Sequence, residues 1–171
     1  MRNFRIVAIA YEETTPENER VIRKITNSLV MKIEYAEESK VYFSGNFNEE
    51  KIRGKLKQIQ ILCEGKEHNF GVVVFDSLKY NPANPQEYDL LFCDLRRFAR
   101  EYEITFVVLL QYDKPYYSLD LQDFQAEYGY DGGIEQDIEL LISLEPMHPD
   151  SFVARVLKNR CGSTGNYLAD I

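Results

Sequence analysis

Two uninterrupted apolar runs constrain the fold of this chain more than any other feature. The runs Gly71-Val-Val-Val-Phe-Asp76 and Ile104-Thr-Phe-Val-Val-Leu-Leu110 leave almost no polar side chain to face water. Successive side chains of a strand point to opposite faces, so such runs are typical of strands that helices cover on both sides. Segments with helical spacing separate these runs from their neighbours. The sequence therefore predicts an α/β protein with a mostly parallel sheet.

Further strands are predicted on both sides of this pair. Arg5 to Ala10 and the short run Val41 to Phe43 precede it. Three more candidates end the chain, at residues 138–144, 152–157 and 167–171. No helical segment separates these three, which indicates an antiparallel end of the sheet. No linker or repeat divides the 171 residues, so a single domain over 1–171 is expected.

Three helices have recognisable start signals. Thr15-Pro16 supplies an N-cap followed by a proline at the first helical position, and Asn84-Pro85 starts another helix. Asn48 can cap the helix between these two, because an asparagine side chain accepts a hydrogen bond from the first turn. The order of elements is then that of repeated strand–helix units followed by strands.

Composition excludes several classes of function. The chain has 28 acidic and 20 basic residues, a net charge of -8, which argues against a general nucleic-acid binder. Its three cysteines form no CxxC pair and stand near no histidine, which favours thiols of a reducing compartment over a metal site. No signal-peptide core and no bilayer-length apolar stretch is visible, so we expect a soluble, cytoplasmic protein.

Polar residues stand at the ends of three predicted strands. These are Glu12, Asp76 and Gln111. In open α/β sheets, ligands bind beyond the carboxyl ends of the strands. Two carboxylates and an amide there suit a site that holds a metal, a water molecule and a polyanion. A strand-terminal acid is also common as a helix cap or turn residue, so this pattern alone leaves both interpretations open.

Two elements near the C-terminus carry a resemblance to a known family. Gly132-Gly-Ile-Glu-Gln-Asp-Ile-Glu139 precedes one predicted strand, and Lys158-Asn-Arg-Cys-Gly-Ser-Thr-Gly165 follows the next. In order and spacing they resemble the S-G-A-I-E-Q-D-A-D and K-Q-R-N-G-P-T-G elements of DnaB-type replicative helicases. The resemblance covers residues 5–171 and favours this helicase over a recombinase or clock-protein relative. It implies a RecA-like, ATP-driven motor for DNA unwinding that works in an oligomeric ring.

The resemblance implies a role for each candidate site residue. Glu12 matches the glutamate of the family's S-L-E-M segment, which activates the attacking water. Asp76 ends the Walker B strand and would hold the Mg²⁺ of ATP through water. Gln111 matches the sensor glutamine, which reports the state of the γ-phosphate. Lys158 and Arg160 match cationic fingers that reach the neighbouring subunit's nucleotide, with Arg160 contacting the ATP itself.

The two finger residues also have a plain alternative. Alternation along a strand places Lys158 and Arg160 on one face, which suits two cations aimed at one phosphate tail. Apart from the motif around them, they equally fit an exposed edge strand with ordinary surface cations. The finger interpretation therefore rests on the family resemblance.

The sequence departs from the family at the phosphate-binding loop. The motor needs G-x-x-x-x-G-K-[ST] after its first strand, where backbone N–H groups cradle the phosphates. The only Gly-Lys pair, Gly65-Lys66, lacks the upstream glycine and the following Ser or Thr. With Ile6 to Ala10 matched to the strand after the P-loop helix, the P-loop strand, the loop and its helix are expected to lie before Met1. The chain alone is then predicted not to bind ATP.

A missing P-loop strand would affect the centre of the sheet. In RecA-like sheets this strand lies between the sensor strand, here 104–110, and the strand at 138–144. We expect these two strands to pair directly, to be bridged by another chain, or to leave the C-terminal strands loosely attached.

Two functions remain open at this point. Residues 112–131 carry one lysine against five acids, with five tyrosines that could stack on bases, so single-stranded DNA binding should be weak. The same segment also suits a mobile surface loop. The chain is either a motor part whose fingers act on a P-loop-bearing subunit of a homo- or hetero-oligomer, or a non-enzymatic module that docks on a helicase ring and modulates it.

Overall fold

The chain folds around a seven-stranded sheet with the strand order β2-β3-β4-β1-β5-β6-β7. The computed structural model describes residues 6–12, 20–24, 26–28, 40–65, 71–79, 85–112, 134–148, 151–160 and 162–170. Strands β1 to β5 are parallel, whereas β6 runs antiparallel to both β5 and β7. The predicted class, a mostly parallel α/β sheet with antiparallel C-terminal strands, is confirmed.

The strands match the apolar runs of the sequence and extend beyond them. They are β1 (Ile6–Glu12), β2 (Lys40–Phe47), β3 (Val72–Lys79), β4 (Thr105–Tyr112), β5 (Leu140–His148), β6 (Ser151–Asn159) and β7 (Gly165–Asp170). The helices with printed bounds are α2 (Glu49–Glu64), α3 (Pro85–Glu101) and α5 (Ile134–Asp137). Residues 20–24 and 26–28 are also helical.

Two of the predicted helix starts are confirmed. The Asn48 side chain accepts a hydrogen bond from the Lys51 backbone N–H at 3.0 Å, and two glutamates occupy the first turn of α2. Helix α3 begins at Pro85, which needs no N–H donor partner in the first turn. The third predicted start, Thr15-Pro16, lies outside the described residues, as does most of the segment 112–131.

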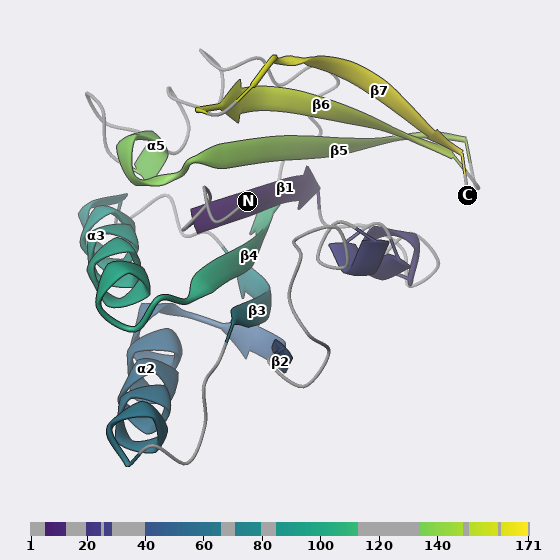
Figure 1. Cartoon of the computed structure of the whole chain (residues 1–171). Helices are drawn as coiled ribbons and strands as arrows, with labels where there is room; N and C mark the ends of the chain where they lie inside the picture. Colours follow the sequence, from purple (N-terminus) through teal and green to yellow (C-terminus); the bar gives the residue numbers. More distant parts are fainter. Residues whose placement is uncertain are drawn as a thin grey trace.

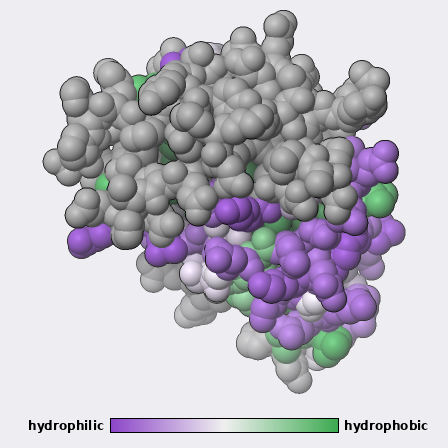
Figure 2. Space-filling view, turned by 180° about the vertical axis from the view of Figure 1, so that it is seen from behind, coloured by the Kyte–Doolittle hydropathy of each residue, from purple (hydrophilic) through white to green (hydrophobic). Residues whose placement is uncertain are grey.

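Helices cover the sheet on two faces (Figure 1). Helices α2, α3 and α5 lie on one face, and the helical residues 20–28 lie on the other. Along β1 the faces alternate, since Ile6 and Ala8 belong to the core under α2 and α3, and Val7 and Ile9 to the core on the opposite face. The outer surface over α2 and α3 is mainly hydrophilic (Figure 2).

The position of β1 corrects the sequence prediction. β1 pairs in parallel with β4 and with β5, so that Ile6 lies opposite Phe106 and Val7 opposite Leu140. The expected gap between the strands at 104–110 and 138–144 is therefore not there, and neither direct pairing nor a second chain closes it. A central strand satisfies the backbone groups of both neighbours, which an open gap would leave exposed.

This position changes which part of the family each N-terminal segment corresponds to. β1 occupies the place of the P-loop strand, between the sensor strand and the strand that follows GGIEQDIE. The helical residues 20–28 come next, as the P-loop helix would. The expectation that this strand and helix lie before Met1 is therefore wrong, and β2 is the strand that follows them.

Candidate functional site

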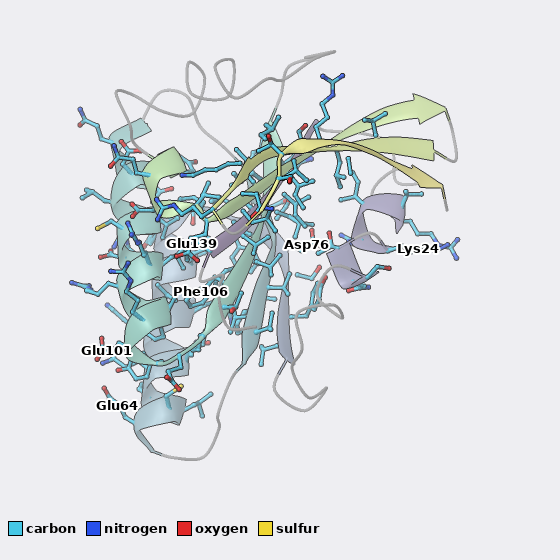
Figure 3. The ribbon with its side chains drawn as sticks, turned by 45° about the horizontal axis from the view of Figure 1, so that its top comes forward. Lys24, Glu64, Asp76, Glu101, Phe106 and Glu139 are labelled. Carbon is cyan, nitrogen blue, oxygen red and sulfur yellow. The ribbon has the colours of Figure 1, made fainter. Side chains whose placement is uncertain are left out.

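Asp76 is the most buried charged group at the carboxyl edge of the sheet among the described residues. It lies in β3, and only 4% of its surface is exposed. The Nε–H of Arg23 donates to its Oδ2 atom at 2.7 Å. Arg23 belongs to the helical residues 20–24 on the β1 side, and Figure 3 shows Asp76 facing that helix. A buried carboxylate needs such a partner, because removal from water without compensation is costly.

A hydrogen bond joins the ends of β3 and β4 beside this ion pair. The Ser77 hydroxyl donates to Gln111 Oε1 at 3.3 Å, and both residues are buried. Gln111 lies in register with Tyr11 of β1. The structure therefore brings Asp76 and Gln111 to the same edge on neighbouring strands.

Tyr42 of β2 completes this cluster. Burial and then the negative charge of Asp76 raise the pKa of Tyr42 to about 12, while Arg23 acts in the opposite direction. The phenol is therefore protonated and neutral near pH 7. Neutral Tyr42 can donate a hydrogen bond but supplies no anionic ligand.

Arg23 and Tyr42 are the site residues that sequence reasoning missed. A lone arginine in a helix and a tyrosine in a short strand carry no motif. The signal that could have found Arg23 was the placement of β1: once β1 is central, the helix after it must lie near the end of β3. The apolar pattern of Ile6 to Ala10 does not determine that placement.

Glu12 ends β1, where its backbone lies in register with Tyr112. Its match to the water-activating glutamate assumed that residues 6–10 form the strand after the P-loop helix. Because β1 is the central strand, that match loses its basis. The strand that follows residues 20–28 is β2, which ends in Ser44-Gly-Asn-Phe47.

Lys158 and Arg160 lie away from Asp76 and Gln111. The backbone N–H of Arg160 donates to Glu139 O at 3.0 Å, and Glu139 N–H donates to Ile6 O at 2.9 Å. Arg160 is therefore level with the first residue of β1, whereas Gln111 is level with the strand's far end. Its guanidinium donates to the Gln136 carbonyl of α5. Lys158 is half-buried in β6, opposite Leu141.

The residues present do not fit magnesium–ATP. The family's metal-binding carboxylate, at Asp76, is bound by a guanidinium. Within the described ranges, no group of three or more His, Cys, Asp and Glu side chains could hold a metal ion. The sequence after β1, Glu13-Thr-Thr-Pro-Glu-Asn-Glu19, contains neither glycine nor lysine and adds three negative charges. Such a segment lacks the donors that cradle phosphates and repels their charge.

The strand order and the antiparallel C-terminal strands define a RecA-like ATPase fold, and the comparisons place it among replicative helicases. The solved ATPase domain of a DnaB-type helicase matches 95% of this chain and 70% of that domain, with a TM-score of 0.51 and 16% identity. A solved DnaB-like replicative helicase, determined with its interactions with primase, matches 95% of this chain with a TM-score of 0.50 and 17% identity.

These matches show the fold of the DnaB-type ATPase domain, at an identity too low to transfer its activity. The chain spans 47% of the length of the second helicase chain. No protein-family model and no curated protein matches the sequence. No helix in the described part of the chain has the length and apolar character needed to cross a membrane.

Proposed function

We propose that this chain is a catalytically silent helicase motor domain, which does not bind or hydrolyse ATP by itself and acts through a helicase ring. The observation that carries the proposal is the ion pair between Arg23 and Asp76, at the position where the family holds its metal. ATP and Mg²⁺ then belong to a neighbouring subunit that has a P-loop.

A second replacement supports the loss of catalysis. With β2 as the strand after the P-loop helix, Asn46 of Ser44-Gly-Asn-Phe47 stands at the glutamate of the family's S-L-E-M segment. An amide cannot take a proton from the attacking water, whereas a carboxylate can. Glu12 then belongs to the acidic segment in place of the P-loop. The phosphate cradle, the water-activating carboxylate and the free metal-binding carboxylate are all replaced.

The finger residues are retained, and their position favours action on a neighbour. Lys158 and Arg160 lie at the level of the start of β1, away from Asp76, so they cannot serve this chain's own site. Arg160 is exposed, and a guanidinium that can leave a backbone carbonyl can stabilise phosphoryl charge on another subunit. This supports a motor part in a mixed ring, with Gln111 as its sensor position.

The second candidate is a non-enzymatic module that docks on a helicase ring and modulates it. It is favoured by the same loss of catalytic groups and by the exposed arginines of α3, Arg97 and Arg100, which offer a charged surface to a partner. In this case the finger residues have no role in hydrolysis. Weak contact with single-stranded DNA is compatible with either candidate.

Rescue of a finger-deficient helicase distinguishes the two. The chain is mixed with a P-loop-bearing DnaB-type helicase whose own finger arginine is replaced, and ATP hydrolysis is measured. A motor part restores hydrolysis, and Arg160→Ala in this chain abolishes the rescue. A modulator gives no rescue and only changes the rate of an intact ring. Hydrolysis of ATP by this chain alone, absent from an Asp76→Asn variant, would contradict the proposal as a whole.

A further inference from the structure

The carboxylate of Asp76 needs a cation at the carboxyl edge of the sheet. Its side chain is 5% exposed, and the nearest printed positive group is the Arg23 guanidinium at 2.7 Å. In nucleotide sites of this fold a hydrated divalent ion stands beside such a carboxylate. We propose that Arg23 is a built-in counter-cation, which takes the place of a divalent metal at Asp76 and keeps this edge of the sheet closed to metal.

The helix that carries Arg23 is held against the sheet by buried neighbours. Ile22 is 1% exposed and packs with Val7, Ile9 and Val74 in the core on this face. Thr26 is buried one turn later, and its hydroxyl donates to the Ile22 carbonyl at 2.9 Å. Because these residues fix the helix, the Arg23 side chain starts from a defined position and loses less conformational freedom in reaching Asp76 than an arginine on a mobile segment.

Two cations cannot share this carboxylate at close range. A Mg²⁺ ion bonds its oxygen ligands at about 2.0–2.1 Å, and a guanidinium within hydrogen-bond distance of the same group would repel it strongly. The other groups nearby offer no anionic replacement. Tyr42 stays protonated, and the Ser77 hydroxyl is donated to Gln111. A metal ion therefore has to displace Arg23 to reach its one carboxylate ligand.

Removal of Arg23 should exchange one cation for another. Arg23→Gln leaves the buried carboxylate beside the neutral oxygens of Tyr42, Ser77 and Gln111, a set that suits a hydrated hard cation. The variant should unfold at a lower temperature than the wild type and gain a response to Mg²⁺ or Mn²⁺. The wild type should show no such response, because its carboxylate already has a partner.

The test is thermal unfolding of the full chain with millimolar MgCl₂ or MnCl₂, against NaCl of equal ionic strength. The Tm of Arg23→Gln should rise by roughly 2–4 °C with the divalent ion, and that of the wild type should not change. Arg23→Gln combined with Asp76→Asn should lose the response, because the carboxylate is gone. Lys24→Gln removes the same charge one residue later, from a side chain that points away from Asp76 (Figure 3), and should behave as the wild type does.

Several outcomes would overturn the inference. They are a divalent-ion response of the wild type equal to that of Arg23→Gln, or an Arg23→Gln variant that ignores both metals. If Arg23→Gln does not fold, the added Asp76→Asn change should restore folding by removing the uncompensated charge, and no recovery would refute the counter-cation. The inference rests on the proposed loss of ATP binding, and the two can fail separately. ATP hydrolysis by the wild type breaks the proposed function, whereas the metal response reports on Arg23 alone.

Discussion

The two faces of the sheet differ in what they hold. On one face, α2 and α3 enclose an apolar core with an aromatic row in which Phe75 stacks between Phe43 and Phe106, at 5.6 and 6.0 Å between ring centroids. On the other face, the aliphatic core around Ile22 lies next to the ion pair of Arg23 and Asp76. The first face stabilises the fold by burial alone, and the second combines burial with the altered site. The scaffold could therefore persist while the chemistry changed at the edge of the second face.

Truncation in the aromatic row should have the largest effect. Phe106 is fully buried between the sheet and the helices (Figure 3). We expect Phe106→Ala to lower the free energy of unfolding by about 3–5 kcal/mol, from lost burial and the cavity left behind. Urea unfolding measures this. Leu90→Ala, at a leucine of α3 that is 62% exposed, should change stability by less than about 0.5 kcal/mol. Similar losses for both would contradict the packing of this face.

The core of the second face should be the next most sensitive. Ile22→Ala should cost roughly 2–3 kcal/mol, since Ile22 is buried in a core of aliphatic side chains without aromatic rings. Ile22→Val is the matched milder change and should cost about 0.5–1.5 kcal/mol. Urea unfolding of both variants sharpens the comparison. A loss below that of Leu90→Ala would mean that residues 20–28 do not pack on the sheet as described.

An ion pair on the first face should contribute less. The Arg96 guanidinium donates to Asp137 at 2.8 Å and ties α3 to α5, with both side chains partly buried. Arg96→Gln should lower stability by about 1 kcal/mol, near the upper end for exposed pairs. Arg97→Gln is the control, because Arg97 is 77% exposed and pairs with Asp94 at 3.2 Å. Its loss should be close to zero, and high salt should reduce both effects.

The smallest expected effect is the alkaline response of Tyr42. Its pKa in the folded chain is about 12 against an unfolded value of 10.0, so between these pH values the unfolded state loses a proton that the folded state keeps. Stability therefore falls as pH rises through this window. Tyr42→Phe should make the fall shallower, as measured by urea unfolding at successive pH values. An unchanged slope would show that Tyr42 ionises freely in the folded chain.

Much of the scaffold could be predicted because its signals are local. The apolar runs at 71–76 and 104–110 predicted β3 and β4, and Asn48 and Pro85 predicted the starts of α2 and α3. Each of these signals lies within one element, in the spacing of apolar residues or in a cap. The family resemblance rested on the two motifs around β5 and β6, and the match to solved helicase folds supports it.

The candidate site could be predicted only in part. Asp76 and Gln111 were found because strand ends of a parallel sheet meet at one edge. Glu12 was assigned to the wrong strand of the family pattern, and Asn46 was overlooked for the same reason. The strand order was the missing information, and it follows from pairings such as Ile6 with Phe106 and Val7 with Leu140, whose partners are far apart in the sequence.

The sequence by itself determined the elements, the parallel class and the lack of a Gly-Lys phosphate loop, because these depend on residues that are neighbours along the chain. Only the tertiary structure decided that β1 is the central strand and that Arg23 meets Asp76. An apolar run fits any buried position in a sheet, so burial alone cannot order the strands. The ion pair joins two residues 53 positions apart, and their encounter depends on where β1 and its helix pack.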